Sequence, residues 1–259
     1  MRRARRLATA ISVALSATPS ATVQAQPAAR EPVTVFAAAD LAQPFAEIAK
    51  AFEAARGIPV RMVIGATGHL ALQIEHGAPA DVFFAANVAF VDGLRAKGIV
   101  VPESERVYAR GRLIVATAAK TGVSVASLAD LARADIKRIA IANPETAPYG
   151  AAARQALQSA RLWETLRPKL VYGENVRQTL QFVESGAVDA GIVGATAARA
   201  PGIRATLVDA RLHAPIDQAA AIVAASKHRA EARAFLDYVL GIDGRRVLAR
   251  YGFAFPDSP

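Results

Sequence analysis

The chain contains no cysteine, few aromatic residues (6%) and no apolar run close to the roughly 20 residues that a transmembrane helix needs. Without cysteine the protein cannot form a disulfide or carry a lipid on a thiol, so its stability must come from packing. The Lys and Arg residues are not clustered between aromatic residues, as a nucleic-acid surface would require. We therefore expect neither nucleic-acid binding nor membrane insertion of the mature protein.

The N-terminus has the features of a secretory signal peptide. Four arginines between positions 2 and 6 precede an apolar stretch, and residues 23–25 (Val-Gln-Ala) resemble a cleavage site. We predict that residues 1–25 are removed near Ala25 and that the mature protein is exported to the periplasm. The formal net charge is +9, and removal of these four arginines leaves +5. A positive field attracts anions, but arginines spread singly along a chain are also typical of ordinary solvated faces.

The remaining sequence alternates short apolar runs with amphipathic stretches, a pattern typical of parallel sheets covered by helices. With 259 residues, of which 53% are hydrophobic, the chain is long enough for two lobes with a core each. The apolar runs predict strands at residues 33–37, 60–64, 81–85, 113–116, 139–142, 170–172, 190–193 and 219–225. The amphipathic segments predict helices after residue 40, from residue 69, at 88–97, 127–133, 150–160 and 176–185, and two at the end of the chain.

These elements divide into two lobes. The two terminal helices are predicted to complete the first lobe, so residues 26–110 and 216–259 form one lobe and residues 111–215 the other. The chain then crosses between the lobes twice, near Tyr108 to Arg112 and near Ala214 to Gln218. We predict an α/β fold of two lobes hinged at these crossings around a cleft, although periodicity alone does not distinguish this topology from others.

In open α/β sheets a ligand binds beyond the carboxyl ends of the strands, so the turns that follow strands are candidate sites. Residues 62–68 read Met-Val-Ile-Gly-Ala-Thr-Gly, an apolar strand and a turn of small residues, and a helix follows from His69. Small residues let a ligand approach the backbone, and the first N–H groups of a helix lack intrahelical acceptors. This turn can therefore hold an anion, with Thr67 as an additional donor, although the same pattern is also ordinary connective structure.

Three further turns could face the same cleft. Asp40 follows an alanine run at a position typical of a helix N-cap. Tyr149 lies near the end of a proline-containing loop, residues 143–150, and Val176 opens a helix after Gly-Glu-Asn. Each residue also has a purely structural explanation: Asp40 as a plain cap, Tyr149 as a surface ring, and Val176 as a core side chain whose N–H alone would reach a ligand.

Four stretches resemble the periplasmic molybdate-binding proteins of ABC importers. They are residues 33–41 (Val-Thr-Val-Phe-Ala-Ala-Ala-Asp-Leu), 73–84 (Gln-Ile-Glu-His-Gly-Ala-Pro-Ala-Asp-Val-Phe-Phe), the loop 143–150, and 250–253 (Arg-Tyr-Gly-Phe). The resemblance covers almost the whole mature chain in order. It implies a type II periplasmic-binding-protein fold in which neutral donors and helix N-termini hold a tetrahedral dianion, molybdate or tungstate, without a cofactor. It also implies delivery of the anion to a membrane permease, and we expect a monomer.

Carried over by position, the resemblance places ligand contacts on Asp40 and Thr67 in the first lobe and on Tyr149 and Val176 in the second. These residues would contact the oxygens of the anion and would not ligate its metal atom. One form of the family has serine at the position of Asp40 and takes a tyrosine donor from the position of Gly194. Another branch has its tyrosine at the position of Tyr149 and an amide or acid at position 40. The phenol donor is therefore expected to have moved in this chain.

Asp40 conflicts with an anionic ligand, because a carboxylate about 4 Å from a dianion is repelled by on the order of 1 to several kcal/mol. We therefore expect its oxygens to turn back onto N–H groups of its own helix, which leaves the backbone N–H of Asp40 for the ligand.

Other functions fit the sequence less well. A hydrolytic enzyme is not expected, because no histidine lies in a nucleophile elbow or a zinc-spaced pair. A carboxylate ligand would require an arginine fork, and no arginine occupies the four turns, although Arg177 lies beside one of them. The tyrosines are too scattered for ferric ion. Sulfate, phosphate and small organic acids stay open as alternative ligands of the same fold.

Overall fold

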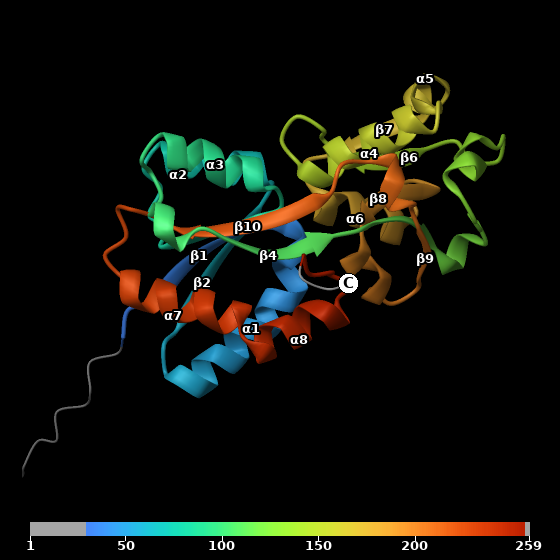
Figure 1. Cartoon of the computed structure of the whole chain (residues 1–259). Helices are drawn as coiled ribbons and strands as arrows, with labels where there is room; N and C mark the ends of the chain where they lie inside the picture. The colour runs from blue at the N-terminus through green and yellow to red at the C-terminus, as the bar shows by residue number, and fades with distance from the viewer. Residues whose placement is uncertain (1–29, 257–259) are drawn as a thin grey trace, which may run out of the picture.

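The computed structural model describes residues 30–256, and the predicted signal peptide lies outside them. The described residues form two lobes, each built on a five-stranded sheet with helices on both faces (Figure 1). Within this range no helix is both long enough and apolar enough to span a bilayer.

The first sheet has the strand order β2-β1-β3-β10-β4 and is mixed. Strand β1 pairs in parallel with β2 and β3, whereas β10 is antiparallel to β3 and β4. The prediction of parallel sheets is therefore wrong for this side of the sheet. The reason is topological, because β4 leaves for the second lobe and β10 returns from it in the opposite direction. The strands are β1 (Val33–Ala38), β2 (Val60–Gly65), β3 (Val82–Ala85), β4 (Arg106–Gly111) and β10 (Ile216–Ile222).

Helices cover both faces of the first sheet (Figure 1). Helices α1 (Ala42–Arg56), α7 (Arg229–Leu240) and α8 (Ile242–Arg250) cover one face, and α2 (Thr67–Glu75) and α3 (Val88–Ala96) cover the other. The core under α1 and α7 is aromatic: Phe45 meets Phe84 edge to face with ring centroids 4.8 Å apart, and Phe235 packs against both rings. The same core cluster includes Ala38 and Ala39 at the carboxyl end of β1, which face the cleft between the lobes.

The second sheet has the order β7-β6-β8-β5-β9, again with both parallel and antiparallel pairs. Helices α4 and α6 pack against opposite faces of it: Ala153 and Leu157 of α4 belong to one core cluster, whereas Val183 of α6 belongs to another. The elements are β5 (Leu113–Ala118), β6 (Ile139–Ala142), α4 (Pro148–Ser159), α5 (Trp163–Leu166), β7 (Leu170–Gly173), α6 (Val176–Ser185), β8 (Ala190–Gly194) and β9 (Ile203–Leu207).

The two crossings between the sheets lie at the ends of the ranges predicted for them, because strands occupy the rest of these ranges. Residues expected to form a crossing near Tyr108 belong to strand β4, and the chain passes between the sheets at Arg112. The returning segment follows β9 and joins the first sheet at Ile216. Strands β4 and β9 escaped prediction because each lies at the edge of a sheet and carries polar residues. The segment predicted as a helix at 127–133 contains a 3-10 helix, Leu128–Ala132.

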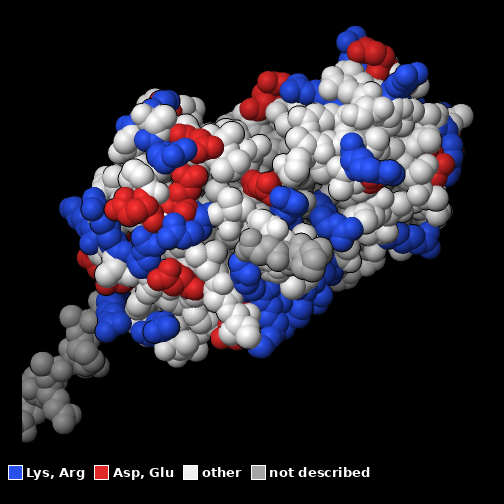
Figure 2. Space-filling view, in the orientation of Figure 1, with Lys and Arg blue, Asp and Glu red and all other residues white. Residues whose placement is uncertain are grey.

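The charged side chains of the face shown in Figure 2 are mixed in sign over the first lobe. A group of basic side chains lies at the lower edge of this view, where α8 carries Arg245, Arg246 and Arg250. Arg246 and Arg250 are paired with Asp243 and Glu47, respectively. Two of these three arginines are thus balanced locally by acidic side chains.

Candidate ligand-binding site

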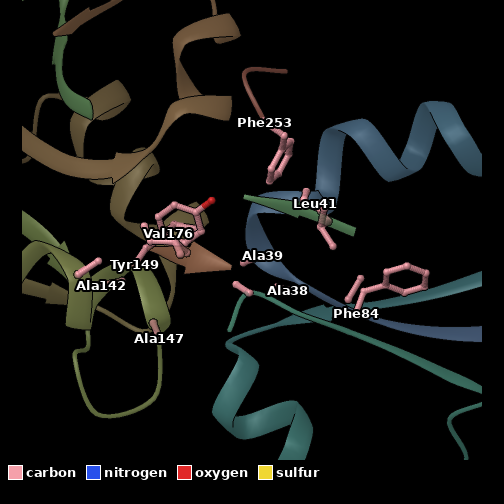
Figure 3. Packing of buried hydrophobic residues seen from close by; sticks show 14 of the residues in the cluster. Ala38, Ala39, Leu41, Phe84, Ala142, Ala147, Tyr149, Val176 and Phe253 are labelled. Carbon is pink, nitrogen blue, oxygen red and sulfur yellow. The ribbon is translucent and has the colours of Figure 1, made fainter. Parts of the chain in front are cut away.

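The four residues predicted to contact a ligand lie at the carboxyl ends of strands from both sheets. Asp40 follows β1, Thr67 follows β2, Tyr149 follows β6 and Val176 follows β7. Figure 3 shows Tyr149 and Val176 of the second lobe opposite Ala38 and Ala39 of the first. One small cavity between the lobes is lined by all four predicted residues together with Ala38, Ala39, Gly65, Ala66, Ala86, Ala147, Pro148 and Asn175. The structure therefore brings the four predicted residues to one place.

The helices of the second lobe begin at this cavity. Val176 is the first residue of α6, so its N–H has no intrahelical acceptor, whereas the Asn175 side chain already accepts from the next two N–H groups. Tyr149 is the second residue of α4, after a proline that has no N–H to satisfy. Tyr149 is 2% exposed, so it is not a surface ring. No lysine or arginine lines the cavity, and an anion there would meet N–H and O–H groups instead.

On the first-lobe side, helix α2 begins at Thr67 rather than at His69. The Thr67 hydroxyl is buried and accepts a hydrogen bond of 3.2 Å from the N–H of Ala86, which leaves its own hydrogen for another acceptor. The neighbouring N–H, of Gly68, donates to the carbonyl oxygen of Thr146 across the cleft at 2.9 Å. Gly68 of the expected anion-binding turn therefore joins the lobes, whereas Gly65, Ala66 and Thr67 line the cavity.

Asp40 does not cap a helix as predicted. It lies inside a short 3-10 helix, Ala39–Leu41, whose N-cap is Ala38 and which has no side-chain cap. Its Oδ2 accepts a hydrogen bond of 2.6 Å from Nε2 of Gln218, a residue 178 positions away in the sequence. Its Oδ1 is buried and makes no hydrogen bond to any residue of the range 30–256. The short hydrogen bond that orients the carboxyl group therefore comes from β10.

Gln218 and Tyr108, which were not predicted as site residues, form a hydrogen-bonded group with Asp40 and Tyr149. Gln218 is fully buried on β10, at an irregularity in the pairing with β4. Its Nε2 also donates to the hydroxyl of Tyr149 at 3.0 Å, and its Oε1 accepts from the hydroxyl of Tyr108 at 2.6 Å. Gln218 thus contacts a residue of each lobe. The signal in the sequence was a polar side chain beside each crossing, Tyr108 in β4 and Gln218 in β10.

Burial is the main cause of the pKa shifts of Asp40, Tyr108 and Tyr149. It raises the pKa of Asp40, and the hydrogen bonds from Gln218 and Tyr149 and the nearby N–H groups of Asp40 and Leu41 act against it. Burial also raises the pKa of Tyr108 and of Tyr149 well above the ordinary value, and the charge of Asp40 adds to both shifts. Both phenols are therefore neutral hydrogen-bond donors at physiological pH.

Contacts between the lobes close the rim of the cleft. Besides the bond from Gly68 to Thr146, Nδ1 of His69 lies 3.6 Å from Oε1 of Glu174 on the opposite lobe. The C-terminal segment is held beside the first crossing, where Ala254 and Arg110 of the same lobe exchange two backbone hydrogen bonds. The described conformation is thus a closed one.

The histidines do not form a catalytic or metal centre in the part of the chain that the structure covers. His69 faces Glu174, His76 contacts the carbonyl oxygen of Leu72, and the other two lie at separate places. Across residues 30–256, no three His, Asp or Glu side chains are grouped so that they could hold a metal ion.

Comparisons with known proteins agree with this architecture. The profile of bacterial extracellular solute-binding proteins matches residues 33–254. The molybdate-binding protein ModA of Azotobacter vinelandii is 36% identical over 225 residues, which are 85% of this chain and 89% of that protein. The ModA of Rhodobacter capsulatus is 32% identical over 230 residues, 88% of this chain and 90% of that protein.

A solved structure is similar over the same extent. The periplasmic molybdate-binding protein of Azotobacter vinelandii has a TM-score of 0.83 and 29% identity, over 87% of this chain and 100% of that one. The predicted fold of two α/β lobes around a cleft is thereby confirmed. From the matched profile and these relatives we conclude that the chain belongs to the family of bacterial extracellular solute-binding proteins.

Proposed function

We propose that this protein is the periplasmic solute-binding component of an ABC importer and that it captures molybdate or tungstate for a membrane permease. The relatives named above as molybdate-binding proteins support this ligand. Asp40, Thr67, Tyr149 and Val176 are proposed to contact the oxygens of the anion. The protein is proposed to act as a monomer without a cofactor and without catalysis.

The observation that carries the proposal is the convergence of four strand-to-helix turns, two from each lobe, on one cavity without lysine or arginine. Such a cavity binds an anion through oriented N–H and O–H dipoles, which suits a tetrahedral oxyanion that must leave water completely. A carboxylate ligand would favour a guanidinium in the cavity. Arg177 does not line this cavity but a neighbouring pocket, which shares Ala39, Asp40 and Val176 with it.

Capture would proceed by closure of the lobes, residues 26–110 with 216–259 and residues 111–215, about the two crossings. Because the cavity is formed by both lobes, the anion has its full set of contacts only in the closed form, and it shifts the protein toward that form. The contact between Gly68 and Thr146 at the rim is made in the same form. The permease would then recognise the closed protein.

A panel of four sodium salts, molybdate, tungstate, sulfate and phosphate, tests the proposal by thermal unfolding at constant ionic strength. A ligand present at 100 times its Kd stabilises the folded protein by about 2.7 kcal/mol, so a tight ligand raises the midpoint clearly. We expect molybdate and tungstate to raise it, and sulfate and phosphate to do so less or not at all. Sodium chloride is the control for ionic strength. A midpoint unchanged by all four anions would refute the oxyanion assignment.

A further inference from the structure

The carboxyl group of Asp40 has two oxygens in different situations. Oδ2 accepts the short hydrogen bond from Gln218, whereas Oδ1 is buried without a hydrogen-bond partner among the described residues. The Asp40 residue is 4% exposed and lines the cavity between the lobes. A buried charged oxygen without a partner is costly. Oδ1 therefore needs either a hydrogen-bond partner or a proton.

The surrounding hydrogen bonds fix the orientation of the carboxyl group. The Tyr108 hydroxyl donates to Oε1 of Gln218, so Nε2 of Gln218 must face Asp40 and Tyr149 as a donor to both. Since Oδ2 already accepts from Gln218, a proton bound to this carboxyl group belongs on Oδ1. The Tyr149 oxygen also accepts from Gln218, so its own hydrogen can be donated to the Asp40 carboxyl group or to a ligand in the cavity.

No cation in the cavity offsets the charge of Asp40. The residues that share the cavity bring no lysine, arginine or histidine, and the two phenols nearest Asp40 are neutral. Arg177 of α6 lines the neighbouring pocket, which Asp40 also lines, but it is not among the groups that shift the pKa of Asp40. His69 of α2 faces Glu174 at the rim. A dianion placed in the cavity would therefore meet an uncompensated carboxylate, and the protonated carboxyl group would be favoured over the charged one.

We propose that this site takes up its oxyanion together with one proton, which is held on Oδ1 of Asp40 so that the neutral carboxyl group donates a hydrogen bond to the anion. This inference rests on the proposed function. The proton comes from solvent, and no covalent bond of the ligand changes. The proton cancels one of the two negative charges of the dianion, so the net charge of the site changes by only one unit. Gln218 is a positioning residue, because it holds Oδ2 and leaves Oδ1 as the oxygen that can carry the proton.

The proton can be counted by titration calorimetry with sodium molybdate. The same titration is repeated in buffers of different ionisation enthalpy, between about pH 6 and pH 9, and the dependence of the heat on the buffer gives the protons bound. We expect uptake to approach one proton per anion where Asp40 of the free protein is ionised. In that range the affinity should fall by up to about tenfold for each unit of pH. Uptake of no proton across the range, with binding intact, would overturn the inference and leave the proposed function standing.

Asp40→Asn is the decisive variant, because its amide can accept from Gln218 with its oxygen and donate into the cavity with its nitrogen. It mimics the protonated carboxyl group at every pH. We expect it to bind molybdate with no proton uptake from this site and with a nearly flat pH dependence. Asp243→Asn, at an exposed ion pair on α8, is the matched control and should behave as the parent protein. Unchanged proton uptake in Asp40→Asn would also refute the inference. Absence of heat with all four oxyanions would instead refute the proposed function.

Gln218→Met tests the positioning role. The Gln218 hydrogen bond lowers the pKa of Asp40, so its removal should raise that pKa and move the proton-uptake curve to higher pH. A residue that only stabilises the fold would lower the unfolding midpoint without moving this curve. Gln181→Met, on the exposed side of α6, is the matched control. A curve unchanged in Gln218→Met would show that Gln218 does not position Asp40.

Discussion

The ring of Tyr149 lies directly against Gly194, so that a β-carbon at position 194 would stand 3.0 Å from Cε1 of the ring. Tyr149 comes from the start of α4 and Gly194 from the end of β8. A side chain at position 194 would crowd the ring, so the absence of one favours the observed place of the phenol. The two positions therefore compete for one space, which supports the interpretation that the phenol donor moved from the end of this strand to the start of the helix.

Tyr149→Phe should weaken molybdate binding by about 10-fold to 100-fold, because a hydrogen bond to a charged group contributes about 1.5–3 kcal/mol. The ring stays in place, so the unfolding midpoint should change little. Titration calorimetry measures the affinity. Tyr172→Phe, at a half-exposed tyrosine on β7, is the matched control and should bind as the parent protein does. Equal affinities for the two variants would mean that the Tyr149 hydroxyl does not contact the ligand.

Gly111→Ala should also weaken binding, through the position of Tyr149. A β-carbon at 111 would overlap with the Tyr149 hydroxyl and lie 2.8 Å from Cζ of the ring, so the ring must move. We expect at least the loss seen in Tyr149→Phe, measured by the same titration. Gly93→Ala is the control, since a β-carbon there meets no atom within 4 Å. If Gly111→Ala bound with parental affinity, the observed place of the ring would not be the one that binding uses.

Thr67→Ala should reduce the affinity without abolishing it, because Thr67 is one of four proposed contacts. It also removes the acceptor of the buried Ala86 N–H, so the free energy of unfolding should fall by about 1–3 kcal/mol. Thr67→Ser keeps the hydroxyl and should restore most of both quantities. Calorimetric titration and urea unfolding separate the two effects. Complete loss of binding in a folded Thr67→Ala protein would indicate that this turn holds the anion alone.

Much of the fold could be predicted because its central elements are local patterns. The segment predicted as a strand at 139–142 is β6, and the helix predicted at 176–185 is α6, which begins after the capping residue Asn175 and ends before Gly186. Apolar runs and end signals both lie within a few residues, so they can be read from the sequence. The edge strands β4 and β9 lack a continuous apolar run and were missed.

The candidate site was predicted only in part, because local patterns reveal residues at strand ends but not their long-range partners. Asp40, Thr67, Tyr149 and Val176 each follow a strand, and the resemblance to a known family added their roles. The partner of Asp40 could not be found in this way, because Gln218 lies 178 residues away and reaches the carboxyl group from a strand whose register shifts beside it. Such a contact depends on tertiary placement, which periodicity does not encode.

Gly68→Ala should lower the affinity by weakening closure of the lobes. The Gly68 N–H donates to the Thr146 carbonyl oxygen across the cleft, and a β-carbon at 68 would stand 3.0 Å from that oxygen. Loss of one such hydrogen bond corresponds to about 1 kcal/mol, or roughly fivefold in Kd. Alanine favours the helix more than glycine does, which offsets the tight contact of 3.3 Å that the β-carbon would make with Cε1 of Phe90 in the same lobe. Gly93→Ala controls for this helical effect, and equal Kd values for the two variants would contradict a role of this contact in closure.

The stability of the ligand-free protein should depend on pH through Asp40. Burial raises its pKa in the folded state above the ordinary value of 3.8, so the folded protein binds more protons than the unfolded chain between these two values. Across that window the contribution of Asp40 to the free energy of unfolding decreases as the pH rises, and above it the full cost of the buried charge is present. Asp40→Asn carries no charge there and should therefore gain stability relative to the parent protein as the pH rises. Urea unfolding of both proteins at several pH values measures this difference, in which the shared titrating groups cancel. A difference independent of pH would mean that the Asp40 carboxyl group titrates alike in the folded and unfolded states.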